Sequence, residues 1–124
     1  MARRILIIDD ESDIREVAAL SLETLAGWEV MVASSGAQGL ARAATYQPDA
    51  ILLDVMMPGM DGPTTFKELR KNPTTAHIPV LLLTAKVQAS DQHLFANLEV
   101  AAVLTKPFDP LTLSNQVANV LGWQ

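Results

Sequence analysis

Short, mostly apolar runs alternate with longer amphipathic segments along this chain. The run from Arg4 to Ile8 is apolar after its first residue, which is typical of a strand buried on both faces of a parallel sheet. Four later runs have a similar length and are bounded by turn residues. We therefore predict strands at residues 4–8, 29–33, 50–54, 79–84 and 100–105.

The segments between these runs repeat apolar residues at helical spacing. In the first segment they are Ile14, Val17, Ala18, Leu22 and Leu25. Gly27 follows as a stop signal. Ser35 with Gln38 three residues later predicts a capping box that opens a second helix, which extends to about Tyr46. Pro63 is typical of the first turn of a third helix, which ends near Lys71.

A fourth helix is expected around residues 91–98, and a fifth follows the last strand. Asp109 and Pro110 fit the cap and first residue of that helix. Its apolar stripe consists of Leu113, Val117, Val120 and Leu121, before Gly122. Five helices alternating with five strands predict an α/β fold, with a parallel sheet covered on both faces. We expect residues 1–124 to form one domain, because 124 residues fit one core.

Composition excludes several functional classes. The formal net charge is −5 and the basic residues are scattered, which argues against direct binding of nucleic acid. No apolar stretch approaches the roughly 20 residues of a membrane span, and no signal peptide is recognisable. The chain has no cysteine and hence no disulfide framework. We expect a cytoplasmic protein without membrane association.

Polar residues follow the apolar runs where the predicted strands end. Asp9, Asp10, Asp54, Thr84 and Lys106 stand at these positions. Ligands of open α/β sheets bind beyond the carboxyl ends of the strands, so these side chains are the candidate site. Carboxylates brought together repel one another unless a cation offsets them. Oxygen ligands without His or Cys favour Mg²⁺, with Mn²⁺ as an alternative.

This set of groups suits phosphoryl transfer. An aspartate can act as the nucleophile and form an aspartyl phosphate. The charge of the transferring group is spread over its oxygens, so catalysis consists mainly of positioning and electrostatic stabilisation. A metal ion, the Lys106 ammonium and the Thr84 hydroxyl can supply that stabilisation.

Four separate motifs resemble the response-regulator receiver domain over nearly the whole chain. They are Ile7–Glu11, Leu53–Gly62, Leu83–Ala85 and Thr105–Phe108. The resemblance, which is to chemotaxis-regulator-like single domains, implies a flavodoxin-like, doubly wound sheet with strand order 2-1-3-4-5. It also implies a role in two-component or phosphorelay signalling.

The resemblance implies a role for each site residue. Asp54 would be the phosphoacceptor, and Asp10, Asp54 and the backbone carbonyl of Met56 would ligate the metal directly. Asp9 would act mainly through metal-bound water. Lys106 would contact the phosphoryl group or the Asp54 carboxylate, across a cis bond to Pro107.

Thr84 would turn toward the phosphoryl oxygen and report phosphorylation at the face of the fourth helix and fifth strand. The phosphodonor would be a histidine kinase or a histidine phosphotransfer protein, and the output partner is not specified. The chain would catalyse only its own phosphorylation and dephosphorylation, and so would not be an enzyme in the usual sense. We expect a monomer or weak dimer, either a stand-alone regulator or one piece of a larger protein.

The sequence departs from the family pattern at two positions on the output side. Val103 occupies the position of the family's aromatic switch, so the signal would pass through Thr84 and loop movement. Glu99 replaces a usual glycine, and a left-handed turn is costly for glutamate, so we expect a different turn there. Met56 and Lys86 stand at positions that border the phosphoryl group in the family. Met56 cannot orient water by hydrogen bonding, so we expect slow hydrolysis.

Two other functions remain possible interpretations of the sequence. Aspartate-nucleophile phosphatases carry an Asp-x-Asp motif, in which the second aspartate is the acid/base. Here Val55 and Met56 follow Asp54, so that acid/base is missing. A flavin-binding module would need a glycine- and hydroxyl-rich loop after the first strand. Residues 9–11 are acidic instead and would repel a phosphate without a metal.

Overall fold

A five-stranded parallel sheet forms the centre of the computed structural model, which describes residues 2–85 and 98–123. The strands are β1 (Arg4–Ile8), β2 (Glu29–Ala33), β3 (Ala50–Asp54), β4 (Val80–Thr84) and β5 (Ala102–Thr105). Their order is β2-β1-β3-β4-β5 and every neighbouring pair is parallel. The predicted order is confirmed, and β4 and β5 begin one and two residues later than expected.

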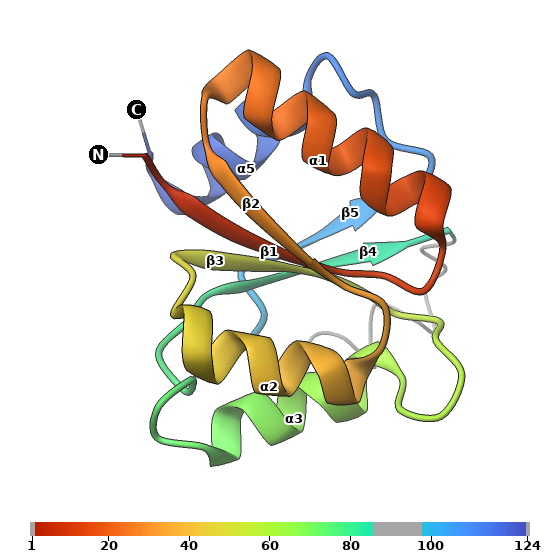
Figure 1. Ribbon diagram of the computed structural model, residues 1–124, viewed down its shortest axis with the longest axis vertical. Coiled ribbons are helices and arrows are strands. Elements are labelled where there is room, and N and C mark those ends of the chain that lie inside the picture. Colours follow the sequence, from red (N-terminus) through yellow and green to blue (C-terminus); the bar gives the residue numbers. More distant parts are fainter. Residues whose placement is uncertain (1, 86–97, 124) are drawn as a thin grey trace.

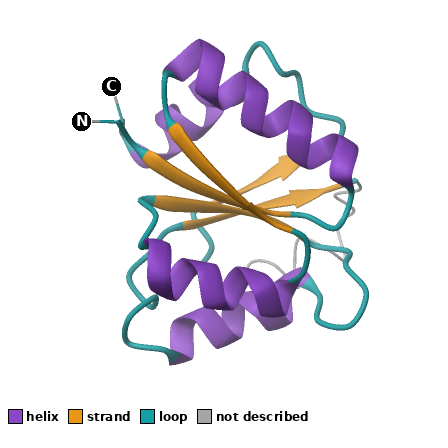
Figure 2. Cartoon of the chain, viewed as in Figure 1, coloured by secondary structure: helices purple, strands orange, loops and turns teal. Residues whose placement is uncertain are grey.

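Helices cover both faces of the sheet. They are α1 (Ser12–Ala26), α2 (Gly36–Tyr46), α3 (Gly62–Lys71) and α5 (Leu113–Leu121). α1 and α5 lie over one face, and α2 and α3 lie over the other (Figures 1 and 2). The described residues thus hold four of the five expected helices. The helix expected around residues 91–98 lies outside the described residues, apart from Leu98, which is in a turn. Lys86 also lies outside them.

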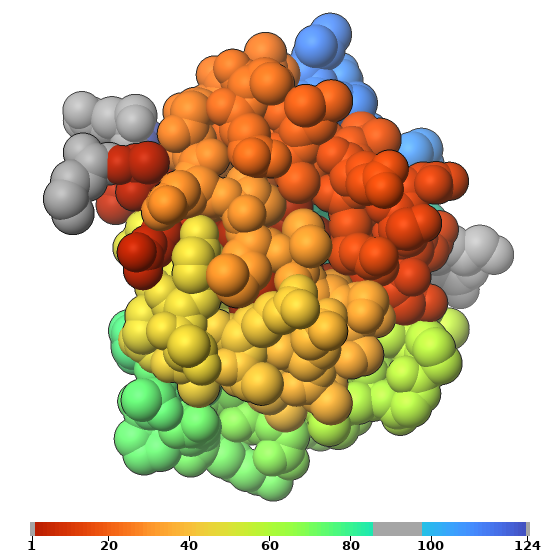
Figure 3. All heavy atoms as spheres, viewed as in Figure 1, coloured from red at the N-terminus to blue at the C-terminus, as the bar shows by residue number. Residues whose placement is uncertain are grey.

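Two apolar clusters explain why β1 is apolar nearly throughout. Side chains alternate across a strand, so Ile5 and Ile7 pack beneath α1 and α5 while Leu6 and Ile8 face α2 and α3. α2 approaches β1 closely, because a Cβ added at Gly39 would lie 2.4 Å from Ile8 Cδ1. On the β2 side, shown in Figure 3, side chains of α1, β2 and α2 form a continuous surface.

The helix ends follow local chemistry, with one correction. Gly27 and Gly122 end α1 and α5 in the left-handed conformation, each with φ of 70°. The prediction that Asp109 caps the last helix and that Pro110 is its first residue is wrong, because α5 begins at Leu113 after the cap residue Thr112. Asp109 stabilises the preceding turn instead, since its Oδ1 accepts a hydrogen bond from the Leu111 amide at 2.9 Å.

Two further local predictions differ from the structure. Ser35 caps α2 by accepting a hydrogen bond from the Gln38 amide, but the Gln38 side chain accepts from the Ser34 amide and does not return to Ser35. The turn before β5 keeps the left-handed conformation, with Glu99 at φ of 55°, so the expected change of turn is wrong. The surrounding chain holds Glu99 there despite the steric strain of a non-glycine residue.

The apolar stripe of α1 is only partly buried. Ala18 and Leu22 are fully buried, whereas Val17 and Leu25, expected on the same face, are 43% and 53% exposed. The helical period gave the correct face but not its edges, because neighbouring elements decide how far burial extends. Within residues 2–85 and 98–123, no helix combines the length and hydropathy that a membrane span requires.

Candidate functional site

Strand register brings two carboxylates to the same edge of the sheet. Ile8 of β1 stands opposite Leu53 of β3. The next residues are Asp9, just beyond β1, and Asp54, the last residue of β3, and they therefore lie side by side at the same edge of the sheet. Both are buried, and the backbone N–H of Asp9 donates a hydrogen bond to Ala33 of the strand on the other side at 3.0 Å.

The same edge receives the ends of β4 and β5. Thr84 pairs with Thr105 in the parallel ladder, and the Lys106 amide donates a hydrogen bond to the Thr84 carbonyl at 2.8 Å. Leu83 of β4 stands opposite Asp54, and the next residue, Thr84, is buried. The Lys106–Pro107 peptide bond is cis, as the resemblance implies.

Lys106 links the carboxylates of two strands. Its Nζ lies 2.7 Å from Asp9 Oδ2 and 3.0 Å from Asp54 Oδ1, and its side chain is only 9% exposed. It also lies 3.6 Å from Glu11 Oε1. Lysine is usually a surface residue, but here three carboxylates hold its side chain in a largely buried position. We call the four acidic residues Asp9, Asp10, Glu11 and Asp54 the carboxylate cluster.

Burial shapes the charges of this cluster. Desolvation by burial raises the pKa of Asp54 from 3.8 to about 6, and the Asp9 charge adds to the rise although Lys106 opposes it. Burial by itself lowers the pKa of Lys106, but its hydrogen bonds to Asp9 and Asp54 outweigh that effect, so the pKa is raised. Lys106 therefore stays protonated while Asp54 retains a cost of ionisation that another cation would remove.

The carboxylates suit a hard divalent cation. Ligand atoms of Asp9, Asp10, Glu11 and Asp54 all lie within 4.8 Å of one another. Asp54 Oδ2 is buried and has no hydrogen-bond partner within the described part of the chain. An ionised oxygen left in this way is costly unless a cation or donor reaches it. Oxygen ligands of this kind fit Mg²⁺ or Mn²⁺, and Asp10 presents an exposed carboxylate at the mouth of the site.

No role was assigned from the sequence to Glu11, a member of this cluster, or to Arg15, a neighbour of it. Glu11 contacts Lys106 through its side chain, and its backbone N–H donates to Asp9 Oδ1 at 2.9 Å. Arg15 of α1 donates from Nη1 to the Asp9 carbonyl at 2.7 Å. Adjacency to Asp9–Asp10 could have indicated Glu11. No sequence signal separates Arg15 from the other basic residues, because its contact depends on how α1 leaves β1.

The loop after β3 borders the cluster. It contains Met56, whose side chain is 76% exposed, and it closes with a hydrogen bond from the Gly62 amide to the Val55 carbonyl at 2.9 Å. Val103, where the family has an aromatic residue, is partly buried opposite Leu82 and packs against the core on the α2–α3 face. Any rearrangement of β5 would therefore move an aliphatic side chain.

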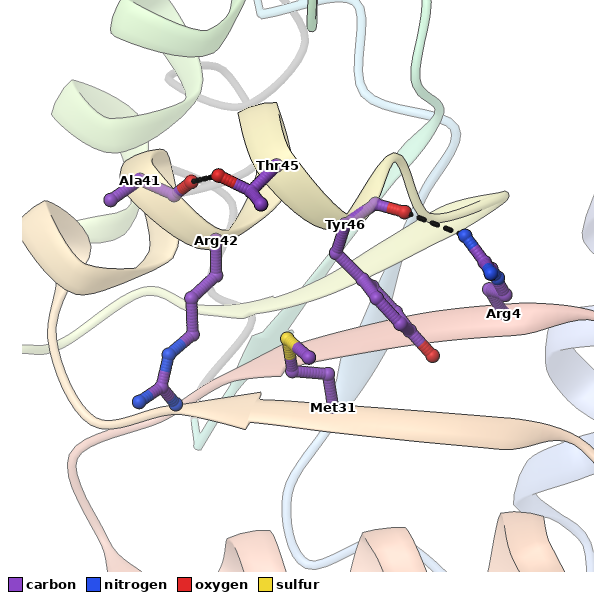
Figure 4. Close-up of a pocket in the computed structure, with 6 residues that line it drawn as sticks. All are labelled: Arg4, Met31, Ala41, Arg42, Thr45 and Tyr46. Carbon is purple, nitrogen blue, oxygen red and sulfur yellow. Dashed lines mark hydrogen bonds between the residues drawn. The ribbon is translucent and has the colours of Figure 1, made fainter.

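A separate concavity of about 520 Å³ lies between α2 and β2. It is lined by Arg4, Met31, Ala41, Arg42, Thr45 and Tyr46. In Figure 4 the Arg42 side chain extends from α2 to the end of β2, where it donates to the Val32 carbonyl. None of the six lining residues belongs to the carboxylate cluster.

The fold and its acidic edge define a class of signalling domain, and comparison with known proteins gives the family. The profile of the response regulator receiver domain matches residues 5–118. The chain belongs to this family and is the receiver domain of a response regulator in two-component signalling.

Individual relatives agree with this assignment. The chain is 45% identical to the DNA-binding dual master transcriptional regulator RpaA of a Synechocystis strain over 106 residues, 86% of this chain and 44% of that protein. It is 43% identical to the response regulator PleD of Caulobacter vibrioides over 97% of this chain and 26% of PleD. It therefore spans less than half of these relatives. Chemotaxis protein CheY4 of Vibrio cholerae superposes with a TM-score of 0.90 at 31% identity, covering 97% of this chain and 99% of CheY4.

Proposed function

We propose that Asp54 accepts a phosphoryl group from a phosphohistidine of a histidine kinase or histidine phosphotransfer protein. The observation that carries this proposal is the environment of Asp54. One carboxylate oxygen is held by Lys106 at 3.0 Å, and the other is buried without a partner in the described residues. A nucleophile with one fixed oxygen and one unsatisfied oxygen is ready to form a new bond.

The transfer forms a bond between an Asp54 oxygen and phosphorus and breaks the bond from phosphorus to the donor's imidazole nitrogen, which leaves with its electron pair. Lys106 already lies between Asp9 and Asp54, so its ammonium can stabilise the negative charge first on the Asp54 carboxylate and then on the phosphoryl oxygens. No proton has to leave Lys106 in this step.

Mg²⁺ or Mn²⁺ would be held by the carboxylates of Asp10 and Asp54 and the backbone carbonyl of Met56, with Asp9 acting through metal-bound water. When bound, the ion would offset the negative charge that gathers at the acidic edge. The role of the chain is to orient these oxygens and to keep Asp54 in a buried pocket.

The readout would pass through Thr84 and the face of β5 and the expected fourth helix, where an unidentified output protein would bind. Val103 lacks the aromatic ring that switches in the family, so we propose that loop movement near Thr84 carries the signal. The chain would act on its own phosphorylation state and not on a diffusible substrate. Val55 and Met56 after Asp54 provide no acid/base for a phosphatase cycle.

The test is phosphorylation by a small donor. The protein is incubated with acetyl phosphate and Mg²⁺, and its intact mass is measured. We expect one phosphoryl adduct on the wild-type protein and none on Asp54→Asn. Absence of an adduct, together with no binding of beryllofluoride in the presence of Mg²⁺, would refute the proposal.

A further inference from the structure

Arg15 lies near the start of α1 and contacts the backbone of the turn that precedes this helix. Its Nη1 donates to the backbone carbonyl of Asp9 at 2.7 Å, in a partly buried setting. None of the ion pairs within the described residues involves Arg15. Its guanidinium is therefore directed at the turn between β1 and α1, and not at a surface carboxylate.

That turn carries the first carboxylates of the cluster. The Asp9 backbone N–H is fixed by Ala33 at 3.0 Å, and its Oδ1 accepts from the Glu11 amide at 2.9 Å. The remaining backbone group of Asp9 is its carbonyl, which belongs to the peptide unit leading into Asp10. Arg15 holds this carbonyl, so it fixes the plane from which the Asp10 side chain projects.

We propose that Arg15 is a positioning residue for the divalent metal, acting through the Asp9–Asp10 peptide. This inference rests on the proposed function of the cluster, because it concerns how that cluster holds its cation. Groups that orient metal ligands by hydrogen bonding commonly change metal affinity strongly when they are removed. Arginine is suited to the task because its charge is permanent and its donors are fixed in one plane.

The chain offers a matched control. Arg42 of α2 also donates a guanidinium N–H to a backbone carbonyl near a strand end, that of Val32 (Figure 4 shows its approach to β2). Its target lies in β2 and not in the carboxylate cluster. Loss of either arginine removes a hydrogen bond from a guanidinium to a backbone carbonyl, but only loss of Arg15 should disturb the metal ligands.

The experiment compares wild type, Arg15→Gln, Arg15→Lys and Arg42→Gln as whole chains. Isothermal titration with MgCl₂ gives the Mg²⁺ dissociation constant, and urea unfolding gives stability. In the metal-free protein, hydrogen exchange of the Glu11 amide reports on the turn. We expect Arg15→Gln to raise the dissociation constant about tenfold, with Arg15→Lys between it and wild type. The Glu11 amide should exchange faster in Arg15→Gln, whereas Arg42→Gln should keep wild-type affinity and exchange.

Two results would overturn the inference: an unchanged Mg²⁺ affinity in Arg15→Gln, or an equal loss of affinity in Arg42→Gln. If Arg15→Gln does not fold, Arg15→Lys decides, and wild-type affinity in that variant refutes the role. The outcome is separable from that of the proposed function. A wild-type protein that binds no Mg²⁺ and gains no phosphoryl group contradicts the function itself. If the wild-type protein does both and Arg15→Gln keeps wild-type Mg²⁺ affinity, only this inference is contradicted.

Discussion

Replacing the Asp54 carboxylate with an amide should stabilise the metal-free protein at neutral pH. Asp54 is buried, and its pKa rises from an ordinary value of 3.8 to about 6. The folded state therefore binds this proton more tightly than the unfolded state does. The contribution of Asp54 to the free energy of unfolding is therefore largest below pH 3.8, and this contribution is lost as the pH rises through about 6.

The pKa sets the size of the effect. A rise from 3.8 to about 6 corresponds to roughly 3 kcal/mol of lost stability once Asp54 is ionised in both states. The shift to about 6 already includes the opposing attraction of Lys106. Asp54→Asn keeps an oxygen for Lys106, so the expected gain in the free energy of unfolding is about 3 kcal/mol at pH 7.5.

Urea unfolding in EDTA, at several pH values between 4 and 7.5, measures this difference. The difference in the free energy of unfolding between Asp54→Asn and wild type should shrink as the pH falls through about 6, because Asp54 of the wild type then becomes neutral in the folded state. Asp13→Asn serves as the control, since Asp13 is an exposed carboxylate in the first turn of α1, and should change stability by less than about 1 kcal/mol. An Asp54→Asn protein that is no more stable than wild type at pH 7.5, or a gain independent of pH, would show that ionised Asp54 is not destabilising here.

Three further predictions concern the loop after β3 and the start of α3. Gly62→Ala should destabilise the fold by about 2 kcal/mol in urea unfolding, because the new Cβ would lie 2.4 Å from the Asp54 carbonyl oxygen; wild-type stability would contradict this close approach. Asp61→Ala should lower the free energy of unfolding by about 1 kcal/mol at neutral pH, since Asp61 caps α3 through the Thr64 amide. Hydrogen bonds from Thr64 lower the pKa of Asp61, so that loss should fade as Asp61 becomes protonated in acid; a loss that persists there would exclude a charge-dependent cap. The acyl phosphate should outlast a few seconds in a time course of intact mass and decay faster in Met56→Asn, whose amide can orient water; rapid decay of the wild type would contradict the expected role of Met56.

The sequence by itself determined the fold class and the location of the site. The run from Arg4 to Ile8 is apolar after its first residue because both faces of β1 are covered, and the structure confirms the strand and its place in the sheet. Asp9 and Asp54 could be assigned to one edge because parallel strands end on the same side. These features depend on local periodicity and chain order, which a sequence displays directly.

Only the tertiary structure decided the details that depend on neighbours distant in the chain. Lys106 is 52 residues from Asp54, and their 3.0 Å contact requires the three strands β3, β4 and β5 to be in register. Glu99 keeps a left-handed turn that its own preference opposes, because the surrounding chain fixes it. The contact of Arg15 with the Asp9 carbonyl depends on the angle at which α1 leaves β1. Packing sets that angle, whereas the residue pattern records only that a helix begins there.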